Sequence, residues 1–564
     1  MKKHGAGKEK KKPAKEAPTP QTWEEYMEEG VLLEEKGERY ATGDKARRFY
    51  EKAGDMYNKA CKLNPEDSDC LYNFGRVLYI LVDFTHSPCQ KLSLLNASIE
   101  RFRSALNYDS DNADTLFNLA QALTTHAEVI QDHDEEDEDE EHDHDHSHGD
   151  HDHAHGSPEE RAATELQEAI ALFESCYSIQ QRELYSAVRE AQPKEEDESA
   201  EMRQQELSAS AGVLIDTLIS ASQALTSLAF LVDTVERSHD YYQQASEKLN
   251  IALGVANDKA LWPTNAEESS SGKGKQAAAE LLMESEEDIL PATKPVSTFR
   301  EAQSQDETVS QKEKTCDIHL QYSNLLSSQT DRNYQDTGKI SEELYEKSLQ
   351  HLDIVLSFYP RHVEALCDKG DLLGAWAQGL AAFEPQVSMA DIERWESRST
   401  IAAEPTASSG ASTKSGSGRP ARIWQLFAQA TRAFLSALEV EPQNTSILEK
   451  LGDIHWSRSL LSSSVALKNR PMLLNNASVY YRFAWESCRD GAENVDEDQR
   501  MDILLSWAQV LRALPGKDEE VIRVLKQWKR VGGTKDMLQD MLEGGAGDIL
   551  QLDFVEFALK LVFN

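Results

Sequence analysis

The chain has 564 residues, of which 39% are hydrophobic and 28% are charged, and its formal net charge is −40. This length allows a sizeable core, while the mean hydropathy of −0.59 indicates that much of the chain is exposed or disordered. A surface this negative repels nucleic acid and anionic membranes and attracts basic proteins. We therefore expect a basic protein or peptide client, with no direct nucleic-acid partner and no membrane partner.

The first 20 residues are rich in lysine and lack the apolar stretch of a secretory signal. We interpret them as a disordered tail, either a nuclear import signal or a solvated terminus. The 7 cysteines of the chain are scattered and are never spaced as C-x-x-C. This spacing argues against a disulfide framework and a zinc site, and it indicates a reducing compartment. The sequence thus predicts a cytoplasmic or nuclear protein, or one found in both places.

One helical pattern recurs along most of the chain. Ala53, Tyr57 and Ala60 share a helical face at spacings of four and three, Pro65 follows, and Leu71 opens the next helix. The same order of small, large apolar and small residues returns at Phe102 and Ala105; at Ala169, Phe173 and Cys176; at Ala245, Leu249 and Ala252; at Leu352 and Val355; at Ala430, Phe434 and Ala437; and at Ala477, Tyr481 and Ala484. Small residues let two antiparallel helices approach, and the large side chain fills the gap between them.

This order, at a period of ~34 residues, resembles the tetratricopeptide (TPR) repeat. The resemblance covers most of 23–489 and implies an all-α, TPR-like helical-hairpin solenoid of about seven degenerate repeats, with long disordered insertions and a C-terminal helical cap. The expected segments are a lysine-rich tail (1–20), repeats (21–257) with a disordered Asp/Glu/His insert (131–157), a disordered linker (258–312), repeats (313–384), a Ser/Gly-rich linker (385–420), repeats (421–490) and the cap (491–564).

The insert alternates aspartate and histidine in the run HDHDHSHGDHDHAH. A run this charged must stay solvated, because burial would leave many charges without partners. Its imidazoles could wrap a transition metal, with the candidate ligands His142, His144, His146, His148, His151, His153 and His155. The other interpretation is a charged spacer that becomes less negative as its histidines protonate near pH 6.

A long apolar run, GVLIDTLISASQALTSLAFLV at 212–232, is interrupted by Asp216, Gln223 and several Ser and Thr residues. These polar interruptions favour a buried solenoid helix over a membrane span.

The sequence contains no phosphate-binding loop, no G-x-G-x-x-G after a strand, no H-E-x-x-H and no G-x-S-x-G. We therefore expect neither an enzyme nor a bound cofactor.

The resemblance implies that the first helix of each repeat lines a concave groove that binds a peptide. In the chaperone-adaptor members of the superfamily, Lys, Asn and Arg at these places grip a carboxylate. The corresponding residues here are Glu34, Glu38, Asn73, Asn118, Asp371, Glu449 and Asp453. Because they are acidic or neutral, they predict a groove that repels a carboxylate and binds a Lys/Arg-rich segment.

We therefore predict a non-enzymatic scaffold, adaptor or holding chaperone for a basic client such as a histone, a ribosomal protein or a translation factor. An acidic insert within a TPR unit is similar to the arrangement in the NASP family of histone-binding proteins, and fungal TPR-type adaptors linked to nuclear import or translation termination are equally compatible with the sequence. Two alternatives stay open: an assembly scaffold that uses the apolar C-terminal helices, and a metal-handling protein. The oligomeric state is left open as well.

Overall fold

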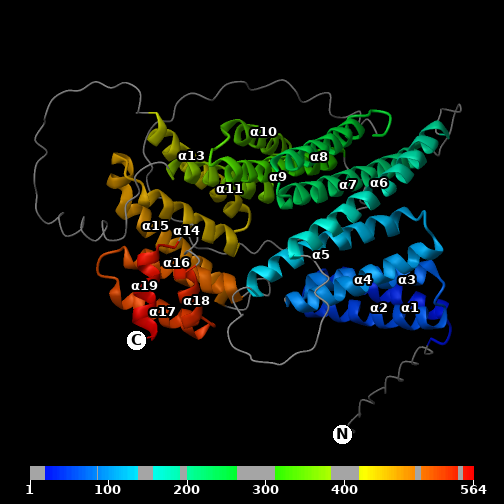
Figure 1. Ribbon diagram of the computed structural model, residues 1–564, viewed down its shortest axis with the longest axis horizontal. Coiled ribbons are helices and arrows are strands. Elements are labelled where there is room, and N and C mark those ends of the chain that lie inside the picture. The colour runs from blue at the N-terminus through cyan, green and yellow to red at the C-terminus, as the bar shows by residue number, and fades with distance from the viewer. Residues whose placement is uncertain are drawn as a thin grey trace, which may run out of the picture.

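The computed structural model describes residues 20–85, 87–137, 157–190, 200–262, 311–382, 418–489, 497–543 and 550–563. Within these ranges the fold is all-α and contains no strand. Figure 1 shows the helices following one another along an arc, from the N-terminal helices through the middle of the chain to the C-terminal ones.

Consecutive helices form antiparallel hairpins. The pairs are α1 (Trp23–Tyr40) with α2 (Gly43–Leu63), α3 (Ser68–Ile80) with α4 (Pro88–Tyr108), α5 (Ala113–Asp137) with α6 (Pro158–Glu190), α7 (Ala200–Leu231) with α8 (Val235–Ala256), α9 (Gln311–Thr337) with α10 (Glu342–Phe358), α11 (Val363–Ala381) with α13 (Arg419–Val440), α14 (Thr445–Leu460) with α15 (Ser464–Arg489), and α16 (Glu497–Arg512) with α17 (Asp518–Arg530). A 3₁₀ turn (Leu81–Phe84) follows α3, and α18 (Lys535–Glu543) and α19 (Leu552–Phe563) end the chain. The chain is a TPR-like helical solenoid.

The turns between hairpins are specified by short polar side chains that cap the next helix. Asp67 accepts a hydrogen bond from the Cys70 backbone N–H (2.8 Å) at the start of α3. Asn112 does the same for α5 (2.9 Å), and Asn444 for α14 (3.1 Å). Each cap satisfies a donor that the first turn of a helix leaves free, so these residues fix where the hairpins that start with α3, α5 and α14 begin.

Within a hairpin, a glycine of the first helix lies against an aromatic ring of the second. A Cβ added at Gly370 would stand 2.6 Å from Cζ of Phe434, and one at Gly452 would stand 2.8 Å from Cε1 of Tyr481. Phe434 is only 1% exposed. The small and aromatic residues of the predicted pattern therefore contact one another, and this contact lets the paired helices pack closely.

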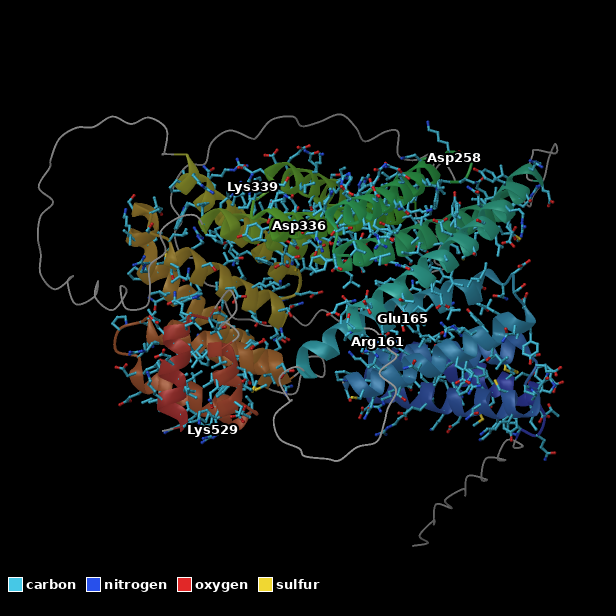
Figure 2. All side chains as sticks on the ribbon, viewed as in Figure 1. Arg161, Glu165, Asp258, Asp336, Lys339 and Lys529 are labelled. Atoms are coloured by element: carbon cyan, nitrogen blue, oxygen red, sulfur yellow. The ribbon has the colours of Figure 1, made fainter. Side chains whose placement is uncertain are left out.

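The C-terminal helices begin with a further hairpin, α16 with α17, which stacks on α15 in the same way as the repeats before it. Trp528, Leu538 and Phe554 join Tyr481 in one hydrophobic cluster, which covers the end of the solenoid. Lys529, labelled in Figure 2, places its Nζ 4.2 Å from the centroid of the Phe563 ring, so α17 and α19 are also joined at the surface.

Two expected boundaries were wrong. The insert was expected to begin at residue 131, but α5 remains helical to Asp137. The linker was expected from residue 258 to residue 312, but Leu261 and Trp262 are buried against α8 and its neighbours, and α9 already begins at Gln311. Trp262 Nε1 donates to the Val255 carbonyl at 3.1 Å, which ties this segment to α8.

The apolar run at 212–232 forms most of α7, which packs against α6, α8 and α9. Within the described residues, Met202–Leu231 is long and apolar enough to cross a membrane by length and composition, and 61% of its most apolar window is buried inside the protein. Burial against three neighbouring helices is what a core helix of a solenoid requires.

Candidate functional site: an acidic row on the first helices

The first helices of the hairpins line the inner side of the curve. They pack on one another directly in the pairs α3 with α5, α5 with α7, α7 with α9, α11 with α14, and α14 with α16, whereas the second helices pack mainly on first helices. Elements on the inside of a curved array are closer together than those on the outside, so this contact pattern places the first helices on the concave wall.

Carboxylates occupy this wall on consecutive first helices. We call the set the acidic row; its members are Asp216 on α7, Asp317 on α9, Glu364, Asp368 and Asp371 on α11, Glu449 and Asp453 on α14, and Asp502 on α16. On α11 the spacing of four and three puts all three carboxylates on one helical face. The row thus extends over five first helices in succession.

Electrostatic coupling shows that neighbouring members of the acidic row lie close together. Burial is the largest cause that raises the pKa of Asp317, and Asp216 and Glu364 raise it further. The pKa of Asp453 is raised in the same way by burial, with additional contributions from Asp371 and Asp502. The carboxylates of α7, α9, α11, α14 and α16 therefore act on one another across the helix boundaries.

Two lysines lie within the acidic row and neutralise part of it. Lys314 Nζ is 2.6 Å from Asp216 and 3.9 Å from Asp317. Lys450 Nζ is 2.5 Å from Asp371, whose side chain is still 46% exposed. With eight carboxylates and two lysines, the row keeps a strong negative excess.

The two predicted residues on α14 are both engaged with neighbouring helices. Gln499 donates to Oε2 of Glu449 at 2.9 Å, and the Tyr481 hydroxyl donates to Oδ1 of Asp453 at 2.5 Å. Burial, with the nearby Asp453 and Asp502 as lesser causes, raises the pKa of Glu449 to about 7. Burial also raises the pKa of Asp453 to about 6.

On α11, Asp371 was predicted from the sequence, while Glu364 and Asp368 were missed. Burial, together with the like charges of Glu364 and Asp371, raises the pKa of Asp368 to about 6. The signal for these residues was present in the spacing i, i+4, i+7 that ends at Asp371. Asp216, Asp317 and Asp502 were not predicted either, because the repeat pattern marks only one or two groove positions on each first helix.

At the N-terminal end the prediction for Glu34 was wrong. Its side chain is only 3% exposed and forms an ion pair with Arg76. The Tyr57 hydroxyl also donates to it at 2.8 Å. Glu34 is thus a buried, paired carboxylate that links α1 to α2 and α3, and it offers no free charge to a ligand. Glu38, one turn further along α1, is exposed.

The two predicted asparagines lie on the same wall, away from the acidic row. Asn73 donates to the Asp69 carbonyl at 2.8 Å on α3. Asn118 on α5 donates to the Asp114 carbonyl at 2.8 Å and to the Tyr72 hydroxyl at 3.3 Å. The structure therefore brings Asp371, Glu449 and Asp453 together, and it separates them from Glu34, Glu38, Asn73 and Asn118.

The candidate metal ligands, His142 to His155, lie outside the described residues. Among the residues that are described, no group of three or more His, Cys, Asp or Glu side chains is arranged to hold a metal ion.

Known proteins show only distant similarity to this chain. The family model of the plant specific mitochondrial import receptor subunit TOM20 matches residues 45–171. Among solved structures, the human IFIT1 dimer with m7Gppp-AAAA is 12% identical, with 96% of this chain and 72% of that chain covered and a TM-score of 0.34. Yeast Tom70 is 13% identical over 94% and 95% of the two chains, with a TM-score of 0.17. The P58(IPK) TPR domain is 12% identical over 90% and 98%, with a TM-score of 0.15. No curated protein matches the sequence. Solved structures with TM-scores this low carry no argument about this chain.

Proposed function

We propose that this protein is a non-enzymatic interaction protein that binds a Lys/Arg-rich segment of a client along the acidic row. It would serve as a scaffold, adaptor or holding chaperone in the cytoplasm, the nucleus or both. A histone, a ribosomal protein or a translation factor has the required basic segments. The observation that supports the proposal is the succession of carboxylates over five first helices, in which Lys314 and Lys450 are paired with Asp216 and Asp371 within the described part of the chain.

The physical basis of recognition is charge complementarity in a partly desolvated groove. Charge-assisted hydrogen bonds from Lys or Arg to carboxylates are about twice as strong as neutral ones, and they fix the register of an extended segment. The raised pKa values of Asp368, Glu449 and Asp453 show that the free protein holds these negative charges at a cost. A cationic segment would relieve this cost. The match to the plant specific mitochondrial import receptor subunit TOM20 family covers residues 45–171, which precede the acidic row, and it is compatible with a receptor role in general.

The direct test is a titration of the full chain with fluorescein-labelled octalysine, followed by fluorescence anisotropy. We expect saturable binding that weakens by about tenfold or more when salt is raised from about 50 mM to about 300 mM, because exposed charges are screened. Labelled octaglutamate serves as the control and should not bind. Equal binding of the two peptides, or no binding of octalysine at low salt, would overturn the proposal.

Binding should also depend on pH. The pKa of Glu449 is about 7 and that of Asp368 about 6, so these carboxylates take up protons in the free protein as pH falls, whereas a bound cation favours their ionised form. Affinity for octalysine is therefore expected to fall by about tenfold or more between about pH 7.5 and about pH 5.5. Calorimetry in buffers of different ionisation enthalpy should show proton release on binding near pH 6.5.

Glu449→Gln identifies the groups responsible for this pH dependence. The glutamine keeps a hydrogen-bond acceptor for Gln499 but has no charge to titrate. We expect this variant to bind more weakly at pH 7.5 and to show a flatter pH profile. A profile as steep as that of the unchanged protein would mean that other groups, such as the histidines of the insert, cause the effect.

A further inference from the structure

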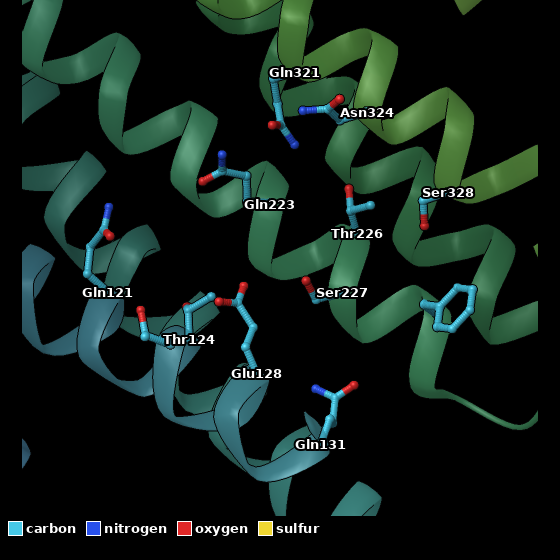
Figure 3. A pocket seen from close by; sticks show the side chains of 12 residues that line it. Gln121, Thr124, Glu128, Gln131, Gln223, Thr226, Ser227, Gln321, Asn324 and Ser328 are labelled. Carbon is cyan, nitrogen blue, oxygen red and sulfur yellow. The ribbon is translucent and has the colours of Figure 1, made fainter. Parts of the chain in front are cut away.

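A polar cleft lies between the first helices α5, α7 and α9, next to the acidic row. Its volume is about 550 Å³, within the range of ~300–1,000 Å³ that ligand clefts occupy. Apart from Glu128 and Phe230, the side chains that line it are uncharged amides and hydroxyls. The amides are those of Gln121, Gln131, Gln223, Gln321 and Asn324. Figure 3 shows that they come from helices on both sides of the cleft.

Gln321 is the most informative of these residues. Its side chain is only 4% exposed, and it lines the cleft without a hydrogen-bond partner among the described residues. Its amide is open only to the cleft, where its two donors and two acceptor sites can pair with a ligand. Figure 3 shows Gln321 beside Asn324 on α9, with Gln223 on α7 facing them. Amides in such a position are ready to pair with a ligand that supplies both N–H and C=O groups.

The cleft and the acidic row are parts of one surface. Asp317, Gln321, Asn324 and Ser328 follow one another on α9 at spacings of four, three and four, which places them on one helical face. A segment whose basic residues lie against the acidic row would therefore bring its adjoining residues into the cleft.

We propose that the cleft between α5, α7 and α9 binds the main chain of an uncharged, extended stretch that adjoins the basic segment of the client. The inference rests on the proposed function and names a second part of the same ligand. An extended main chain presents an N–H and a C=O at every residue, and amide side chains pair with both regardless of sequence. The scarcity of charge in the cleft disfavours a second basic block there, so the ligand is bipartite, with a basic part and a neutral polar part.

The test compares four labelled peptides on the full chain: octalysine alone, octalysine with a Ser-Gly hexapeptide at its N-terminus, the same hexapeptide at its C-terminus, and octalysine flanked by oligosarcosine. One Ser-Gly orientation is expected to bind about threefold to tenfold more tightly than octalysine. Sarcosine, whose methylated nitrogen cannot donate, is expected to add no affinity. This comparison needs no change to the protein.

Gln321→Leu removes the amide at nearly constant volume and is expected to abolish the gain from the Ser-Gly flank while leaving octalysine binding unchanged. Gln243→Leu, an exposed position on α8, is the matched control and should keep the gain. If octalysine binds but neither flank adds affinity, or if sarcosine adds as much as Ser-Gly, the inference is wrong and the proposed function stands. If octalysine itself does not bind, the proposed function is wrong.

Discussion

Replacing Glu364 and Asp368 together with lysine is expected to weaken octalysine binding by about a hundredfold or more. Glu364 is exposed and Asp368 is partly buried; they share one face of α11 in the middle of the acidic row, and neither has a hydrogen bond or ion pair within the described part of the chain. The change replaces two attractive charges with two repulsive ones, and like charges brought together in an interface cost several kcal/mol. Anisotropy titrations at about 50 mM salt measure the effect.

A second double variant separates the site from the net charge of the molecule. Glu236→Lys with Asp240→Lys has the same spacing and changes the net charge equally, but it lies on α8, a second helix, where both side chains are exposed. This control is expected to change affinity by less than about threefold, through long-range steering alone. Circular dichroism and thermal melts should be alike for all three proteins. If the two double variants weaken binding equally, a local acidic row is not the binding site.

The fold was predictable because its determinants are local. Small residues and aromatics at spacings of four and three, followed by Asp67, Asn112 or Asn444 as helix caps, specify a hairpin and its start within about 34 residues. The long segments between α11 and α13 and between α8 and α9 did not hide the pattern, because each helix carries its own half of the contact. The sequence assigns the eighth hairpin of the described residues, α16 with α17, to the cap, because its second helix lacks the small, aromatic and small residues at spacings of four and three.

The site was less predictable because charges are compensated by residues that are distant in the sequence. In the sequence, Glu34 is a carboxylate at a groove position and is therefore expected to bind a ligand. In the structure, Arg76 from the next hairpin forms an ion pair with it and neutralises its charge. The sequence predicts that the segment containing Trp262 is part of a polar linker. In the structure, the Trp262 indole N–H donates a hydrogen bond to the Val255 carbonyl. Helical spacing alone could have extended the acidic row from Asp371 to Glu364 and Asp368, whereas the coupling of Asp317 to Glu364 depends on how α9 and α11 stack.

Phe434→Ala is expected to lower the free energy of unfolding by about 3–5 kcal/mol, the usual loss for truncating a fully buried aromatic side chain. Phe434 is 1% exposed and its ring lies directly against Gly370. The contact joins α11 to α13, which are far apart in sequence, so its loss should also open α11 locally. Urea unfolding followed by circular dichroism measures the first effect, and amide hydrogen exchange of α11 measures the second.

Two controls show whether the loss of stability comes from the contact between Phe434 and Gly370: a substitution at the next residue, and a double variant at both positions. Leu435, the next residue, is 37% exposed, and Leu435→Ala should change stability by no more than about 0.5 kcal/mol. Gly370→Ala in the otherwise unchanged protein should destabilise it, because the new Cβ would meet the ring at 2.6 Å. With Phe434 already replaced by alanine, the same change should instead stabilise the helix by up to about 1 kcal/mol, since alanine is the better helix former. A Gly370→Ala effect of the same sign in both backgrounds would show that the ring is not what requires glycine at this position.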